Sequence, residues 1–212
     1  MTAFPIDPKY SKVLINAPEY NCLDEALSLV AILSSENVFY TPLHKRDEAF
    51  KVKQKFVSPF GDHITLLNVF KAFCKTTLKK QWCKENYLNH KNLAYAADVR
   101  QQLLAVCQRL NLAVTSCGTA VDQLLKCLLS GLFTNCAWAR GSGVQGRYVT
   151  ASGLAAVLHP ASSLRTQKPP PAVLYSELLQ SRRAYLLTVS VIEPQWLHQI
   201  APDYARRCRA TR

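Results

Sequence analysis

The sequence has no run of about 18 or more apolar residues, and a helix that crosses a membrane is therefore not expected. Its first residues, Met-Thr-Ala-Phe-Pro-Ile-Asp-Pro, do not place a basic region before an apolar stretch, so no secretory signal is visible. Internal repeats and low-complexity tracts are also missing. The chain of 212 residues is 49% hydrophobic, which is enough to bury a core and predicts one or two small domains.

The cysteines lack the spacing of a zinc or disulfide site, because the sequence contains no C-x-x-C pair and no Cys/His knuckle. Most of them lie among apolar residues, where a free cysteine behaves as a small hydrophobe. We expect a reducing, intracellular compartment and no metal in this chain. The positions are Cys22, Cys74, Cys83, Cys107, Cys117, Cys127, Cys136 and Cys208.

Acidic residues are missing between residues 123 and 176, and the whole chain has a net charge of +12 and a pI near 9.5. Such a field attracts polyanions, either nucleic acid or an acidic protein surface. Basic residues form three clusters, which favours a polyanion-binding face, although a solvated helix surface is an alternative for the lysine run. The clusters are Lys71, Lys75, Lys79, Lys80, Lys84; Lys126, Arg140, Arg147, Arg165, Lys168; and Arg206, Arg207, Arg209, Arg212.

The hydrophobic period divides the chain into two parts. Up to about residue 132 it is helical, and the segment 41–61, charged and broken by prolines, is expected to be a mobile basic connector with one helical stretch at 45–56. The predicted helices are residues 10–17, 23–33, 62–75, 81–88, 91–110 and 119–132. The period then becomes 2, with strands at 133–139, 147–150, 155–159, 172–179 and 184–192 and a final helix at 195–200. The predicted fold class is α+β, an N-terminal helical bundle followed by a small five-stranded β-barrel of the oligonucleotide-binding (OB) type.

Three helical pieces with a fixed order carry a resemblance to a known family: residues 61–68, 81–88 and 97–103. In the first piece, Asp62 is a plausible N-cap, and His63 is interpreted as a structural residue at the helix end rather than as an RNA contact. Further matching segments are Phe4-Pro5-Ile6-Asp7-Pro8, Leu23-Asp24-Glu25-Ala26-Leu27, Leu158-His159-Pro160-Ala161-Ser162-Ser163, Val173-Leu174-Tyr175-Ser176-Glu177 and Ile192-Glu193-Pro194-Gln195-Trp196-Leu197.

Taken together, these segments resemble the C-terminal region of DEAH-box ATP-dependent RNA helicases, with nucleolar-type members the most similar branch. The resemblance implies a helicase-associated helical bundle at residues 1–130 and an OB-fold barrel at 131–205, followed by a basic, disordered tail at 206–212. It implies a chain that binds RNA, single-stranded or structured, and an activator protein as a possible partner. A monomer without membrane contact is expected, in the nucleus and specifically the nucleolus, with the cytoplasm as an alternative.

The motor of that family has no counterpart in the sequence. There is no G-x-x-x-x-G-K-[ST], and the near miss at Gly141 to Gly146 lacks the lysine and leads into a predicted strand. Asp24-Glu25-Ala26-Leu27 has leucine where the metal-binding box of the family has histidine. The resemblance therefore implies that ATP and Mg²⁺ bind motor domains outside this chain, which has no catalytic residue of its own, so whether it acts as an enzyme stays open. We expect a truncated product, an isoform or an incomplete gene model, whose stability without the motor domains is an open question.

The candidate RNA-binding residues are mostly in the predicted barrel, where basic side chains with an interleaved aromatic could hold phosphates and stack on bases. The alternative is a solvated rim. Arg100 lies in an otherwise apolar helix, where a phosphate contact and a buried ion pair with Asp98 or Glu25 are equally consistent with the sequence. The full set is Arg140, Arg147, Tyr148, Arg165, Lys168 and Arg100. The leading interpretation is an RNA-binding accessory region of a DEAH-type helicase; the alternative is a protein-interaction module for a helicase activator or a ribonucleoprotein partner.

Overall fold

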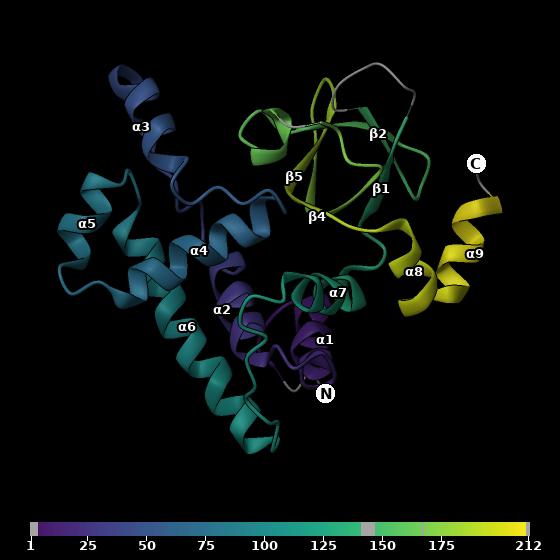
Figure 1. The fold of residues 1–212 in the computed structure, drawn as a ribbon, viewed down its shortest axis with the longest axis horizontal. Helices are drawn as coiled ribbons and strands as arrows, with labels where there is room; N and C mark the ends of the chain where they lie inside the picture. Colours follow the sequence, from purple (N-terminus) through teal and green to yellow (C-terminus); the bar gives the residue numbers. More distant parts are fainter. Residues whose placement is uncertain (1–3, 141–146, 167, 211–212) are drawn as a thin grey trace.

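The computed structural model describes residues 4–140, 147–166 and 168–210. In these residues the chain forms a helical bundle, a closed five-stranded barrel and two further helices, which confirms the predicted α+β class (Figure 1). The bundle consists of α1 (Pro8–Asn16), α2 (Leu23–Leu33), α3 (Arg46–Lys53), α4 (Asp62–Lys75), α5 (Lys79–Glu85), α6 (His90–Arg109) and α7 (Val121–Leu132). Short 3-10 turns cover Ala17–Tyr20, Leu43–Lys45 and Ser163–Thr166.

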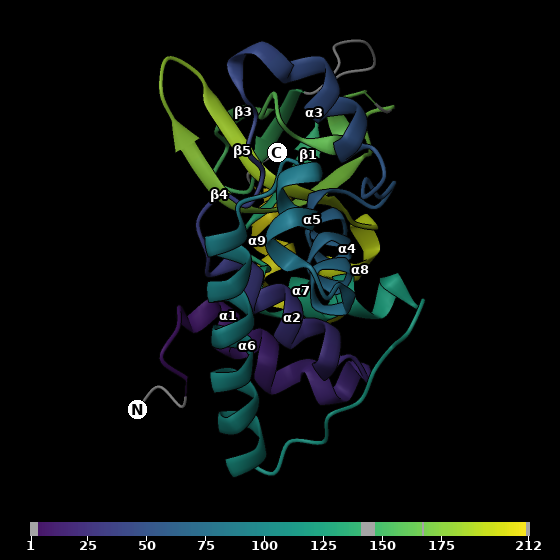
Figure 2. The same cartoon turned by 90° about the vertical axis from the view of Figure 1, so that its left-hand side faces the viewer.

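The barrel contains β1 (Cys136–Ala139), β2 (Arg147–Thr150), β3 (Ala155–Leu158), β4 (Ala172–Gln180) and β5 (Ala184–Val191). Its strands close in the order β1-β2-β3-β5-β4, with β3 and β5 parallel and the other pairs antiparallel. The long β4–β5 hairpin extends beyond the barrel wall (Figure 2). The alternation of the sequence therefore predicted all five described strands to within a few residues.

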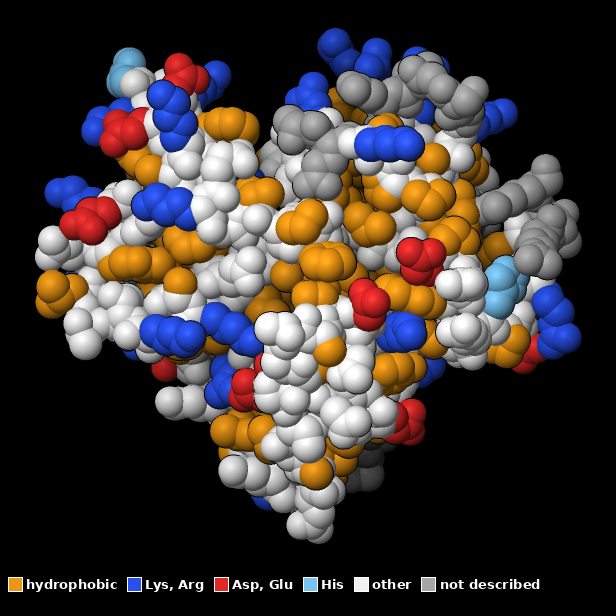
Figure 3. All heavy atoms as spheres, viewed as in Figure 1, with side chains coloured by type: hydrophobic (Ala, Val, Ile, Leu, Met, Phe, Trp, Pro, Cys, Tyr) orange, Lys and Arg blue, Asp and Glu red, His pale blue; other side chains and the backbone are white. Residues whose placement is uncertain are grey.

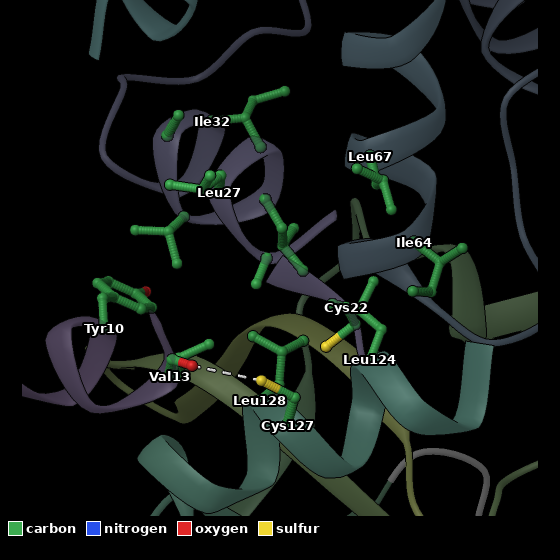
Figure 4. Packing of buried hydrophobic residues seen from close by; sticks show 14 of the residues in the cluster. Tyr10, Val13, Cys22, Leu27, Ile32, Ile64, Leu67, Leu124, Cys127 and Leu128 are labelled. Atoms are coloured by element: carbon green, nitrogen blue, oxygen red, sulfur yellow. Dashed lines mark hydrogen bonds between the residues drawn. The ribbon is translucent and has the colours of Figure 1, made fainter. Parts of the chain in front are cut away.

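Helix α2 is the centre of the bundle because it is apolar on almost every side. It packs against α4, α6 and α7, and Figure 4 shows Leu27 and Ile32 of α2 among side chains from α1, α4 and α7. Cys22 and Cys127 are fully buried in this core, where the Cys127 thiol donates to the Val13 carbonyl over 3.4 Å. The prediction that such cysteines behave as small hydrophobes is consistent with these positions, since all eight are free.

The predicted connector at 41–61 contains one helix, α3 (Arg46–Lys53), as expected for the stretch 45–56, and most of its side chains are exposed. The chain just before it pairs with the chain before α6, where the Tyr40 amide donates to the Tyr87 carbonyl over 2.8 Å. In α3, the Lys53 ammonium donates to the Ala161 carbonyl of the barrel over 2.9 Å. The charges and prolines of this segment gave no sign of these two long-range contacts.

Part of the basic tail predicted at 206–212 lies in a helix, up to residue 210. After α8 (Pro194–Ile200), a further helix α9 covers Pro202–Ala210. It is anchored because Ala205 and Cys208 are buried and Tyr204 stacks edge-on against Phe133, with ring centres 5.2 Å apart. The arginines dominated the interpretation of this segment, although its apolar residues lie on one helical face.

Candidate nucleic-acid interface

The Gly61-Asp62-His63 segment joins the bundle to the barrel. Asp62 is the first residue of α4 and not its cap, which corrects the predicted role. One oxygen of its carboxylate accepts from the amide and the hydroxyl of Ser163, both over 2.7 Å, and the other accepts from the Val189 amide over 2.9 Å. The acidic group thus satisfies barrel donors rather than its own helix, which the sequence could not reveal because the partners lie more than a hundred residues away.

His63 completes this joint. Its ring is fully buried, with Nδ1 2.9 Å from the Ser190 hydroxyl and Nε2 2.9 Å from the Ser176 hydroxyl. Burial disfavours the charged imidazolium and lowers the pKa of His63 to about 4, although the nearby Asp62 carboxylate opposes this shift. The predicted structural role of His63 agrees with this environment, because both ring nitrogens are used within the protein.

A large cleft of about 1080 Å³ lies between the bundle and the barrel. Helix α3 and the chain before it form one wall, and the turn after β3 with parts of β4 and β5 forms the other. Figure 3 shows this hollow between the two lobes, with apolar side chains on its floor. Tyr40 and Phe50 line it and are 60% and 57% exposed, so they are the accessible aromatic residues here. The sequence offers no reason to single them out, because Phe50 lies in the predicted connector and Tyr40 immediately precedes it.

The charges of this cleft are mixed. Its basic side chains are Arg46, Lys53 and Arg165, and its acidic side chains are Glu36, Asp47, Asp62 and Glu177. Burial lowers the pKa of Lys53, whose ammonium is 4.5 Å from the centre of the Phe39 ring. The cleft therefore does not present the surplus of positive charge that a phosphate backbone requires.

Four of the six predicted residues lie at the same end of the barrel and are here called the barrel rim: Arg140, Arg147, Arg165 and Lys168. Arg165, in the 3-10 turn after β3, also lines the cleft. Arg140 follows the end of β1 and its amide donates to the Arg147 carbonyl at the start of β2 over 3.1 Å. The start of β4 pairs with the end of β1, which brings the preceding Lys168 to the same end. All four side chains are exposed, and none forms an ion pair within the described residues.

The other two predicted residues are not available for RNA. Tyr148 is 1% exposed inside the barrel, where its hydroxyl donates to the Pro170 carbonyl over 3.2 Å and burial raises its pKa to about 12. Arg100 donates to the Asp24 carboxylate and to the Ser28 hydroxyl, so the ion-pair alternative holds, with a partner that was not considered. The period of 2 could have placed Tyr148, because adjacent strand residues face opposite sides and Arg147 faces solvent.

Most of the positive charge lies outside the barrel. Between residues 45 and 91 the sequence has eleven basic and four acidic side chains, a surplus of seven out of the total of +12. Two of the eleven form ion pairs: the Lys71 ammonium is 3.0 Å from the buried carboxylate of Glu25, and the Lys45 ammonium is 3.5 Å from the exposed carboxylate of Glu48. Burial disfavours the charge on Glu25, but hydrogen bonds from Ser116, Lys71 and the Cys117 amide outweigh it and lower the pKa of this carboxyl.

Neither a metal site nor a membrane span is found in the described part of the chain. No group of three or more His, Cys, Asp or Glu side chains could hold a metal ion there. None of its helices is both long enough and apolar enough to cross a bilayer. The near miss to a phosphate-binding loop at 141–146 lies outside the described residues.

Two family models match the chain. Residues 7–66 match the ratchet-like helicase-associated domain HA2, and residues 124–204 match the oligonucleotide/oligosaccharide-binding (OB) fold. The first match ends within α4, and the second covers the barrel and α8. The helical bundle and the barrel therefore occur in the same order as the two family models.

Relatives with the same arrangement are RNA helicases. The chain is 40% identical over 203 residues to the ATP-dependent RNA helicase DHX33 of Drosophila melanogaster, which covers 95% of the chain and 29% of that protein. Human DHX33 is 37% identical over 207 residues, 98% of the chain and 29% of that protein. The pre-mRNA-splicing factor ATP-dependent RNA helicase prp22 of Schizosaccharomyces pombe is 36% identical over 210 residues, 99% of the chain and 18% of that protein. The chain thus spans less than a third of these relatives, and together with the two domain matches they show that it belongs to the DEAH-box RNA helicase family, as its C-terminal helicase-associated and OB-fold region.

Proposed function

We propose that the chain is an RNA-binding accessory region of a DEAH-type helicase and that single-stranded RNA binds at the barrel rim. The observation that carries this proposal is the gathering of four exposed cations, without carboxylate partners among the described residues, at one end of an OB-type barrel. Lysine and arginine at such positions hold phosphates, and an OB-type groove follows the backbone of a strand. Because Tyr148 is buried, phosphate contacts rather than base stacking supply most of the affinity.

In this proposal the chain contributes binding and no ATP hydrolysis. ATP and Mg²⁺ would bind motor domains outside the region that this chain matches in its ATP-dependent relatives. We further propose a monomer in the nucleus, including the nucleolus; imaging of the tagged chain beside a nucleolar marker tests this, and exclusion from the nucleus would contradict it.

Charge reversal at three rim residues tests the RNA proposal: Arg140→Glu, Arg147→Glu and Lys168→Glu together. We expect the affinity for an oligouridylate of about ten nucleotides to fall at least tenfold, because three phosphate contacts are replaced by repulsion. Lys51→Glu with Arg109→Glu is the control, since both residues are exposed and distant in sequence from the rim. An affinity of the rim variant equal to that of the control would contradict the proposal.

A protein-interaction module is the second candidate, and the cleft favours it. Mixed charges, an apolar floor and two exposed aromatic residues suit a polypeptide better than a phosphate backbone. The partner would be an activator protein of the helicase or a ribonucleoprotein component. Tyr40→Ala with Phe50→Ala should then abolish capture of the partner and leave RNA affinity unchanged, whereas the rim variant should do the opposite. If either variant loses both partner capture and RNA binding, the cleft and the barrel rim belong to one site.

A further inference from the structure

Four exposed lysines surround the turn between α4 and α5: Lys75, Lys79, Lys80 and Lys84, here called the α5 lysine patch. Helix α5 lies at the edge of the molecule away from the barrel (Figure 1). None of the four ammonium groups forms an ion pair in the described residues. The neighbouring carboxylate of Glu85 accepts from the Gln81 amide over 2.9 Å, so it has a partner other than a lysine.

The folding of α4 and α5 explains only part of these charges. Lys75 and Lys84 lie in last turns, where the helix dipole favours positive charge, and the Lys79 ammonium lies over the ring of Phe73. Lys79 and Lys80 lie in the first turn of α5, which has no acidic residue, although the helix dipole disfavours positive charge there. Lys80 and Lys84 are four residues apart, so they are neighbours of equal charge on one helix face. Both effects weaken the first turn of α5, in contrast to Lys71, which stabilises the buried Glu25. Four exposed ammonium groups are thus grouped together without a carboxylate partner in the described residues, which points to an external anion.

We propose that the α5 lysine patch binds the phosphate backbone of structured RNA that continues from the single strand held at the barrel rim. This step rests on the proposed function, because it assigns a second contact for the same ligand. Helix α5 has seven residues and is about 10 Å long, which corresponds to about three phosphates along one strand of a duplex. Lysine provides a mobile point charge that suits phosphate without reading bases.

The composition of the patch favours RNA over an acidic protein. Cores of protein interfaces are enriched in aromatic residues, methionine and arginine and depleted in lysine. Here the exposed apolar side chain is Leu78, whereas Trp82 is turned inward against Phe56, with ring centres 5.9 Å apart. Phe73 is also buried, with the Lys79 ammonium 5.0 Å from the centre of its ring.

Lys80→Glu with Lys84→Glu tests the proposal in the full chain. The probes are an oligouridylate of about ten nucleotides and an RNA hairpin with the same sequence as a single-stranded tail. We expect the affinity for the tailed hairpin to fall about tenfold and the slope of log K against log salt to shrink by about 2, while the affinity for the oligouridylate changes less than about twofold. The control variant Lys51→Glu with Arg109→Glu has the same net charge and should bind both probes like the unchanged chain.

Several results would overturn this assignment. Unchanged binding of the tailed hairpin would exclude the patch as an RNA contact, and competition by polyglutamate as effective as that by RNA would indicate a general acidic ligand. If the rim variant binds the oligouridylate normally, the proposed function fails, yet the effect of the patch on the hairpin can still be measured. The patch variant exchanges one pair of like charges on α5 for another, so its melting temperature should stay close to that of the unchanged chain. A large fall in melting temperature would identify misfolding as a separate outcome.

Cys74 allows a direct test of position, because it is exposed and the other seven cysteines are buried or half-buried. A photo-crosslinker attached to its thiol lies beside Lys75. We expect it to react with the stem of the tailed hairpin, and the same treatment of Cys74→Ser serves as the control. Crosslinks confined to the single-stranded tail, or none at all, would contradict the proposal.

Discussion

The hydrophobic core of the bundle is much larger than that of the barrel. The main core runs from α1 through α2 to α8 and α9, whereas the barrel interior is a separate set of nine buried residues in the described chain: Ala137, Tyr148, Ala156, Leu158, Leu164, Val173, Tyr175, Leu186 and Val189. So small a core contributes little stability alone. The barrel is held in addition by the polar joint at residues 61–63, so the bundle provides stability and the barrel presents the rim.

Gly61→Ala should disrupt the joint between bundle and barrel more than any other substitution considered below. Gly61 has φ +112, and a Cβ there would lie 2.3 Å from the Val189 carbonyl oxygen and 2.6 Å from the Ser190 Cα. We expect a loss of about 3 kcal/mol or more in the free energy of unfolding, from backbone strain and displacement of β5. Gly118→Ala is the matched control, because Gly118 has φ +59 but nothing within 4 Å of its Cβ position, and it should lose only about 1 kcal/mol. Equal losses in denaturant titrations would show that the joint is not close-packed.

His63 should make the joint sensitive to acid. Its pKa is about 4 when folded and about 6.5 when unfolded, so between these values the unfolded chain binds the extra proton. The stability that the neutral ring contributes is complete above about pH 6.5 and is lost as the pH falls to about 4, by up to about 3 kcal/mol. Denaturant titrations from pH 7 to pH 5 should show this decline in the unchanged chain and a flatter profile in His63→Gln. A parallel profile in both proteins would refute the role of His63.

Asp62→Asn should weaken the joint by about 2 kcal/mol, because an amide nitrogen replaces one acceptor and leaves a barrel donor such as the Val189 amide without a partner. The control Asp47→Asn changes an exposed carboxylate and should shift the unfolding free energy by less than about 0.5 kcal/mol. Similar values for the two substitutions in thermal or chemical unfolding would mean that the Asp62 contacts add no stability.

Tyr148→Phe sharpens the distinction between the barrel core and the rim. It removes the hydrogen bond to the Pro170 carbonyl and should cost about 1 kcal/mol of stability, while RNA affinity stays unchanged. The opposite pattern, intact stability with weaker RNA binding, would return Tyr148 to the interface.

Local patterns in the sequence predicted the elements but not their partners. The strand predicted at 147–150 and the helix predicted at 62–75 agree with β2 and α4. The same alternation could also have predicted that Tyr148 faces the barrel interior. The acceptors and donors of Asp62, His63 and Arg100 come from segments far apart in the chain, and no local pattern specifies them. For the same reason the sequence revealed the three basic clusters but could not show which would share a surface.

The salt dependence of RNA affinity tests the central claim most directly. Four phosphate contacts at the barrel rim predict a slope of log K against log salt of about −3 for single-stranded RNA, a weakening of about fiftyfold between 50 and 200 mM salt. In the rim variant the slope should become shallower by about 2, to about −1. An affinity of the unchanged chain that does not vary with salt would contradict the claim that the rim binds RNA through its phosphates.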